Sequence, residues 1–201
     1  MDLKELLKLS PKLHEDGKGN LTSYQLSDEA LSFIDKHVNE ECLTLETGAG
    51  VSTILFAIKR SEHICITPNE REIERIISFC KQHKILTKRI KFYADRSERV
   101  LPSLKVKNLD FVLIDGRHAF PTPFIDWFYT APKLKIGGLL MIDDTQLLTG
   151  KILKQFLLLE PEWELVKDFP PRTAVFKKLK AGSVNKWWGE QAFMAKSFNF
   201  S

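Results

Sequence analysis

The sequence predicts an α/β fold, a doubly wound and mostly parallel seven-stranded sheet that ends in a C-terminal antiparallel hairpin. Short apolar runs alternate with amphipathic stretches of helical spacing, which is typical of a parallel sheet covered on both faces. Two further strand-like runs, Trp163–Phe169 and Thr173–Leu179, are joined only by Pro170-Pro171-Arg172. Because this connection is too short for a helical crossover, the two runs should pair antiparallel.

Five parallel strands should precede that hairpin. They are expected at Cys42–Glu46, His63–Thr67, Arg89–Tyr93, Phe111–Asp115 and Leu139–Asp143. A helix should begin at Val51, and Asn69 should cap the next one, with Glu72 three residues later as a capping-box partner. The buried stripe of that second helix is predicted to hold Ile73, Ile76, Ile77 and Cys80.

The strand and helix pattern divides the chain into three parts. Residues 1–26 form an N-terminal extension with a helix at Leu3–Leu9 and a loop, residues 27–180 form the α/β domain, and residues 181–201 form an aromatic tail. We expect the tail, which includes Phe198 and Phe200, to pack on the domain. A homodimer contact and a lid over a ligand pocket are the alternatives.

Composition excludes several classes of protein. Hydrophobic residues make up 43% of the 201 residues and charged residues 28%, a globular balance. No apolar run approaches the roughly 20 residues that span a bilayer, and the N-terminus lacks the apolar block of a secretory signal. Cys42, Cys65 and Cys80 form no CxxC pair. We therefore expect a cytoplasmic protein with reduced thiols, no zinc and no membrane partner.

The net charge of +4 does not by itself indicate a nucleic-acid partner. Basic residues gather in Lys81–Lys91 and again in Lys177–Lys186. Aromatic residues that stack on bases are not interleaved with them, so solvated helix ends and strand margins explain these clusters better. We expect no nucleic-acid partner.

A glycine turn follows the first strand in Glu46–Thr53, with the sequence ETGAGVST. Glycines there let the backbone turn tightly and approach a ligand. A nicotinamide dinucleotide site would need a third glycine where Thr53 stands, and an acid for the ribose where Thr67 ends the second strand. The sequence of the turn therefore disfavours a dinucleotide ligand.

Four segments resemble class I S-adenosylmethionine-dependent methyltransferases in their order and spacing. They are LETGAGVST, FYADRSERVLPSL, LDFVLIDGRHAF and LKIGGLLMIDDT. The nearest branch is the small-molecule O-methyltransferases of the macrocin type, and the resemblance covers Ser27 to Leu179. It implies a Rossmann-like fold and transfer of a methyl group from S-adenosyl-L-methionine to an oxygen of a small-molecule acceptor.

The resemblance also implies the residues that hold this cofactor. Carried over residue by residue, they are Glu46, Gly48, Ala49, Gly50, Ser52, Thr67, Asn69, Asp95, Arg96 and Asp115. Ser52 would lie near the cofactor carboxylate at a helix N-terminus, and Asp95 would contact the adenine amine or serve as a plain helix cap. The sequence departs from the family at Thr67, where the family has a ribose-binding acid and this chain has only Asn69 and Glu70 nearby.

Catalysis and metal binding are expected where the fourth and fifth strands end. By the same resemblance, Asp115, Asp143 and Asp144 would hold Mg²⁺ beside the substrate hydroxyls, or Asp143 and Asp144 would simply end a strand and cap a loop. His118, three residues after Asp115, is a candidate general base, because a neutral imidazole can take a hydroxyl proton. It is equally a candidate for positioning the adenine.

Absent motifs narrow the function. The Asn/Asp-Pro-Pro-aromatic motif of enzymes that methylate base amino groups is replaced here by Asp115-Gly116-Arg117-His118. A related hydroxylase would need an iron site, and no 2-His-1-carboxylate spacing supports one. The main alternative is a catalytically inactive protein of the same fold that acts as a binding module, since Thr67 replaces the ribose acid.

Overall fold

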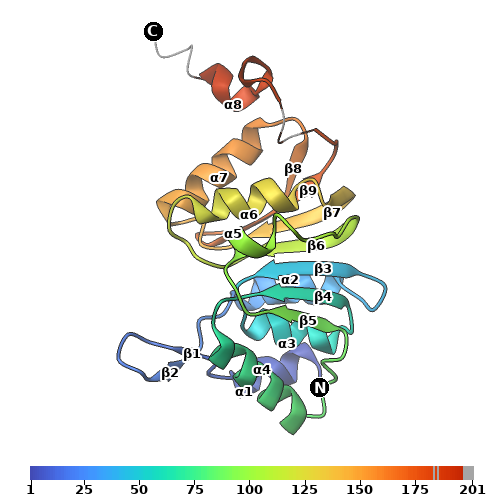
Figure 1. Cartoon of the computed structure of the whole chain (residues 1–201), viewed down its shortest axis with the longest axis vertical. Helices are drawn as coiled ribbons and strands as arrows, with labels where there is room; N and C mark the ends of the chain where they lie inside the picture. Colours follow the sequence, from blue (N-terminus) through green and yellow to red (C-terminus); the bar gives the residue numbers. More distant parts are fainter. Residues whose placement is uncertain (183, 185, 197–201) are drawn as a thin grey trace. The chain divides into compact units, whose positions relative to one another are not determined.

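The computed structural model describes residues 1–182, 184 and 186–196. The chain divides into two compact units, Met1–Val100 and Leu101–Ser201. Each unit is an α/β layer of strands and covering helices (Figure 1).

The first unit carries the glycine turn. Its elements are α1 Leu3–Leu9, β1 His14–Glu15, β2 Leu21–Thr22, α2 Asp28–His37, β3 Leu43–Thr47, α3 Val51–Ile58, β4 Glu62–Ile66, α4 Glu70–Gln82, β5 Ile90–Tyr93 and α5 Ser97–Val100. Strands β3, β4 and β5 run parallel in the spatial order β5-β4-β3, and β1 pairs with β2 as a separate antiparallel hairpin. Helices α3 and α4 pack against each other beside these strands (Figure 1).

The second unit carries the aspartates. Its elements are β6 Leu109–Ile114, α6 Thr122–Thr130, β7 Leu134–Ile142, α7 Leu148–Leu159, β8 Trp163–Phe169, β9 Thr173–Lys178, the 3-10 helix η1 Trp188–Glu190 and α8 Ala192–Ala195. The strand order is β6-β7-β9-β8, with β6 and β7 parallel and β9 antiparallel to both of its neighbours. Helix α6 packs on β6, and α7 packs on α6 and β8.

The predicted fold is confirmed: the protein has a Rossmann-like, mostly parallel seven-stranded sheet with a C-terminal antiparallel hairpin. The predicted helix Leu3–Leu9 and strand Trp163–Phe169 have the observed bounds, and most other strands differ by one or two residues. Strand β7 begins at Leu134, five residues before the predicted start, because Gly137 and Gly138 extend the strand instead of preceding it.

Three details of the sequence prediction are wrong or incomplete. The N-terminal loop contains the hairpin β1–β2, which is too short to give an alternating pattern. Ile77 was predicted to be buried on α4 but is 42% exposed, whereas Ile73, Ile76 and Cys80 are buried. Asn69 caps α4 by accepting from the backbone N–H of Glu72, but the Glu72 side chain accepts from the side-chain amide of Asn69 and not from its backbone N–H, so the capping box is incomplete.

The cysteines are free thiols, as the sequence predicts. Burial, followed by the nearby charge of Glu46, raises the pKa of Cys65 well above its ordinary value, and burial raises the pKa of Cys80 to about 11. Within the described ranges, none of the helices has the length and apolarity that crossing a membrane requires.

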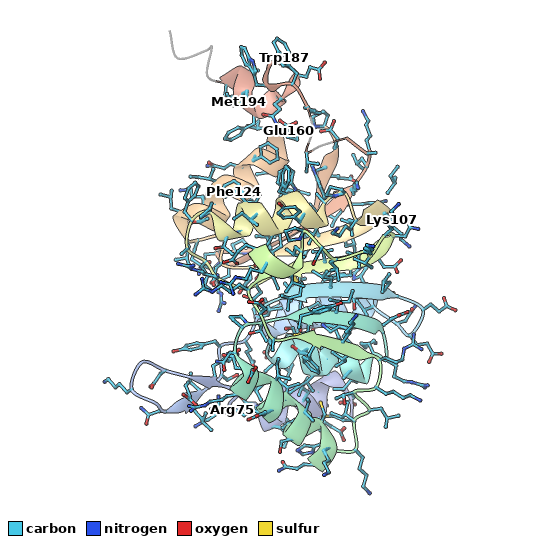
Figure 2. The ribbon with its side chains drawn as sticks, in the orientation of Figure 1. Arg75, Lys107, Phe124, Glu160, Trp187 and Met194 are labelled. Atoms are coloured by element: carbon cyan, nitrogen blue, oxygen red, sulfur yellow. The ribbon has the colours of Figure 1, made fainter. Side chains whose placement is uncertain are left out.

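The aromatic tail is described in part, and Phe198 and Phe200 lie outside the described residues. Lys186 Nζ donates to Glu160 and Glu162 at 3.0 and 2.7 Å. The backbone N–H of Phe193 donates to Glu160 at 2.9 Å, and its ring packs on Phe156. Figure 2 labels Glu160 close to Met194 of this tail segment.

Candidate functional site

The glycine turn begins where β3 ends. Gly48 has φ +93°, a left-handed conformation that favours glycine, and its N–H donates to the carbonyl of Ile66 at 2.9 Å. Gly50 then stands at the N-cap of α3. The first N–H groups of a helix have no partner within the helix, so the turn presents backbone donors and a partial positive charge to an anion.

Glu46 supports this turn from the interior. Its side chain is 1% exposed, and its carboxylate accepts hydrogen bonds from the Ser52 hydroxyl at 2.7 Å and from the Thr53 hydroxyl. It also pairs with His63 Nε2 at 3.1 Å. Thr53 in turn accepts from the N–H of Gly50 at 3.0 Å. The Glu46 carboxylate therefore joins β3, β4 and the start of α3.

Ser52, predicted to lie near a cofactor carboxylate, directs its hydroxyl to Glu46 instead of outward. Its backbone N–H, in the first turn of α3, keeps the predicted anion-binding role open. Glu46, His63 and Cys65 have ligand atoms within 4.8 Å of one another. The Cys65 thiol donates to the carbonyl of Gly48 at 3.4 Å, and its raised pKa disfavours the thiolate that a metal would need. We therefore interpret this cluster as structural.

Two buried polar atoms beside the turn have no hydrogen-bond partner among the described residues. They are the hydroxyl of Thr47, the last residue of β3, and Nε2 of His14 in β1. Nε2 of His14 lies 3.1 Å from the position that a Cβ on Gly50 would occupy. Because buried polar groups are nearly always bonded, unpaired atoms at this place are what a missing ligand would leave.

Thr67 and Asn69 meet Glu72 at the end of β4. Asn69 Nδ2 donates to Glu72 Oε1 at 2.9 Å, and the Thr67 hydroxyl donates to Glu72 Oε2 at 3.4 Å. His14 Nδ1 lies 3.2 Å from Glu72 Oε1. Neither Glu72 nor His14 was predicted from the sequence to lie beside Thr67 and Asn69. The signal for Glu72 was present, since it stands one helical turn after Asn69, but it was interpreted as a capping residue.

Asp95 and Arg96 follow β5. Asp95 Oδ1 accepts from the N–H of Arg96 at 2.7 Å and pairs with Arg99 at 3.5 Å, with a side chain that is 46% exposed. The carboxylate therefore fixes the entry to α5 and also stays accessible. Both predicted roles of Asp95, as a helix cap and as an adenine contact, remain predictions.

Asp115, His118 and Asp144 come together at the ends of β6 and β7. Their ligand atoms lie within 4.8 Å of one another, and His118 Nε2 is 3.0 Å from Asp144 Oδ2. The parallel register of Ile114 with Ile142 explains this, because both chains leave the sheet at the same edge. The His118 side chain is 44% exposed, so the cluster is open to solvent.

Asp143 is oriented differently from its neighbour Asp144. Its side chain is fully buried, and its two oxygens accept from Arg172 Nη2 at 2.6 Å and from the hydroxyl of Thr173. Arg172 also lies 3.3 Å from Asp144 Oδ1. The structure therefore brings Asp115 and Asp144 together with His118, and directs Asp143 into the β8–β9 hairpin.

From the sequence, Arg172 was recognised only as part of the short connection between the last two predicted strands. Desolvation lowers its pKa, but the charges of Asp143 and Asp144 raise it by more, so the net pKa lies above the ordinary value. A permanent positive charge therefore stands beside these aspartates. No sequence motif marks a basic residue in a short turn as part of a site. Arg172 reaches the aspartates only because β9 pairs with β7.

A model of a protein family described as "Methyltransferase domain" matches residues 45–145. No curated protein sequence matches the chain. The matched span runs from β3 through the glycine turn to the residues that follow β7. It includes Glu46, Glu72, Asp115, His118 and Asp144, and leaves out His14 and Arg172.

Solved structures share the fold at low identity. The O-methyltransferase TomG from Streptomyces achromogenes, in complex with SAM, matches with TM-score 0.68 and 14% identity over 88% of this chain and 90% of its own. A SAM-dependent O-methyltransferase from Thermotoga maritima matches with TM-score 0.62 and 14% identity, over 90% of this chain and 72% of its own. An rRNA methylase from Streptococcus thermophilus matches with TM-score 0.60 and 13% identity, over 76% of this chain and 96% of its own.

Proposed function

Because the chain belongs to the methyltransferase-domain family whose model matches residues 45–145, we propose that it transfers a methyl group to an oxygen of a small-molecule acceptor. The methyl donor is S-adenosylmethionine. The O-methyltransferase TomG and the rRNA methylase named above both share the fold, so the fold does not identify the acceptor, and the side chains of the site have to be considered.

The observation that supports an oxygen acceptor is the contact between His118 Nε2 and Asp144 Oδ2 at 3.0 Å. A hydroxyl must lose its proton when its oxygen attacks a methyl group, and an imidazole held by a carboxylate can take that proton. Asp144 accepts from Nε2–H, so the ring presents Nδ1 as the free base. The Asn/Asp-Pro-Pro-aromatic motif of base-amino methylation is absent after β6, which disfavours that acceptor.

The chain's residues divide the work of the reaction. S-adenosylmethionine supplies an electrophilic methyl group on a sulfonium. In the first unit, the backbone at Gly48, Ala49 and Gly50 would hold it, and the two unpaired polar atoms beside the turn fit a polar nucleoside. In the second unit, His118 takes the acceptor proton and Asp144 orients the ring. The protein's contribution is alignment and deprotonation.

A Mg²⁺ ion fits part of the predicted set. Asp115, His118 and Asp144 offer three ligand atoms within 4.8 Å of one another. Asp143 offers none, because Arg172 and Thr173 already bind its carboxylate. We therefore propose Asp115 and Asp144 as the residues that would hold Mg²⁺, a cation that prefers carboxylate oxygens, with His118 beside them as the base. Such an ion would lower the pKa of the acceptor hydroxyl.

Calorimetry with S-adenosylmethionine and S-adenosylhomocysteine tests the family function directly. We expect binding of both. A turnover screen with hydroxylated small molecules and with rRNA then tests the acceptor, and methylation of rRNA alone would refute the proposed one. Cofactor binding without turnover on any acceptor would favour the binding-module alternative.

Variants test the base. His118→Gln should lower kcat by about 100-fold or more, the range typical of lost general base catalysis. His37→Gln on α2 is the control and should leave kcat unchanged, because the exposed His37 ring bonds to the carbonyl of Phe33 and stacks on the Phe33 ring, within its own helix. Full activity in excess EDTA would remove Mg²⁺ from the proposal and leave His118 as the base.

A further inference from the structure

The end of β4 lies directly beside the glycine turn. Thr47 pairs in register with Ile66, and the N–H of Gly48 donates to the carbonyl of Ile66 at 2.9 Å. Thr67 is therefore the residue that flanks the turn on the β4 side. Its single neutral hydroxyl is a poor substitute for a carboxylate, which can accept hydrogen bonds from two hydroxyls at once.

A carboxylate nevertheless reaches this place from α4. Glu72 is held through Oε1, which pairs with Asn69 Nδ2 at 2.9 Å and His14 Nδ1 at 3.2 Å. Within the described part of the chain, Oε2 has only the long 3.4 Å contact with the Thr67 hydroxyl. One oxygen is thus fixed by two short contacts, and the other keeps most of its capacity to accept hydrogen bonds.

His14 links this carboxylate to the turn. An ionised carboxylate only accepts, so Nδ1 carries the hydrogen toward Glu72, and Nε2 of the neutral ring is an acceptor. That Nε2 is one of the buried atoms without a partner among the described residues, and it lies 3.1 Å from the position of a Cβ on Gly50. The His14 ring therefore bridges Gly50 and Glu72.

The N-terminal hairpin holds His14 in place. Arg75 of α4 donates to the carbonyl of Leu13 at 2.9 Å and pairs with Glu15, and Arg71 lies 3.7 Å from Glu15. Figure 2 labels Arg75 on α4. Residues on both sides of His14 are thus clamped to the helix that carries Glu72.

We infer that Glu72 supplies the carboxylate that binds the ribose diol of the cofactor, in place of the residue that ends β4, and that His14 is its positioning residue. This inference rests on the proposed function. A diol offers two O–H donors, and a carboxylate at the rim of a nucleotide-binding turn is a common partner for them. Here the acid comes from the third residue of α4, and one of the two residues that orient it, His14, lies outside the matched family span.

Calorimetry with S-adenosylhomocysteine and its 2′-deoxy and 3′-deoxy analogues tests the inference. The wild-type protein should bind the intact diol about 10- to 100-fold more tightly than at least one deoxy analogue, the range for a hydrogen bond to a charged group. Glu72→Gln should weaken binding of S-adenosylhomocysteine and lose most of this preference. Glu74→Gln, on the same helix but exposed, is the matched control and should keep it.

Two further variants separate recognition from folding. His14→Asn keeps a donor near the Nδ1 position and should retain the diol preference, whereas His14→Ala should reduce it. Thr67→Asp in the Glu72→Gln background should restore the preference by placing an acid at the end of β4. A structural role alone would change thermal stability but would leave the ratio of the two affinities constant.

The outcomes distinguish the inference from the function on which it rests. No binding of S-adenosylhomocysteine by folded wild-type protein overturns the proposed function. Binding with a diol preference that persists in Glu72→Gln overturns only the inference, and loss of the preference in Glu70→Gln instead would assign the carboxylate to Glu70. If Glu72→Gln does not fold, the comparison of His14→Asn with His14→Ala decides.

Discussion

Replacing Asp143 by Asn should destabilise the protein, whereas the same change at Asp144 should affect the site and little else. The Asp143 side chain is fully buried and accepts from Arg172 at 2.6 Å and from the Thr173 hydroxyl. An asparagine there keeps the shape but removes the charge, and it exchanges one acceptor oxygen for a donor. One of the two hydrogen bonds must then break.

The expected cost follows from the burial of each partner. Removing one partner of a buried ion pair costs about 3 to 5 kcal/mol. The Arg172 side chain is 39% exposed and keeps Asp144 at 3.3 Å, so solvent and the second carboxylate offset part of that loss. We expect Asp143→Asn to lower the free energy of unfolding by about 2 to 3 kcal/mol.

Urea unfolding followed by circular dichroism measures this loss, and Asp144→Asn is the matched control. Asp144 pairs with His118, whose side chain is 44% exposed, and such pairs contribute about 0 to 1 kcal/mol. Equal losses for the two variants, or a loss below about 1 kcal/mol for Asp143→Asn, would show that Asp143 does not anchor the hairpin. Asp143 would then return as a candidate metal ligand.

Three further predictions concern the turn, the thiols and the cation beside the acids. Gly48→Ala should cost about 1 to 2 kcal/mol in thermal unfolding, since φ is +93°, and an unchanged Tm would contradict the strain argument. Burial raises the pKa of Cys80 to about 11, so at pH 8 iodoacetamide should modify it about 100-fold more slowly than the half-buried Cys42. Mass spectrometry measures the two rates, and equal rates would show that Cys80 is accessible. Arg172→Gln should strengthen Mn²⁺ binding about tenfold in electron paramagnetic resonance titrations, because it removes a cation 3.3 Å from Asp144. An unchanged affinity would show that Arg172 does not oppose a metal at these acids.

The fold could be predicted because its signals are local. The stripe on α4, the cap at Asn69 and the short connection Pro170-Pro171-Arg172 each depend on neighbours in the sequence, and the structure confirms the elements that they predict. Ile77 was misplaced because helical spacing alone does not give the width of the face that a helix buries. Ile77 lies at the edge of that face and is 42% exposed.

The candidate site was predictable only where its residues directly follow the ends of neighbouring parallel strands. Asp115, His118 and Asp144 follow parallel strands, so their proximity follows from the fold. His14 and Arg172 reach their places through pairings 58 and 29 residues apart in the sequence, and no motif marks either of them.

The position of β9 has a consequence for biosynthesis. Among the described residues it is the last strand in sequence, yet it lies between β7 and β8. Its final residue, Lys178, is buried and donates to the carbonyls of Ala131 and Leu134 at 2.6 Å. Until this strand leaves the ribosome, β7 has an open edge and the turn after α6 lacks its lysine. Such unpaired edges recruit other chains, so the nascent second half needs protection from aggregation until residue 178 is free.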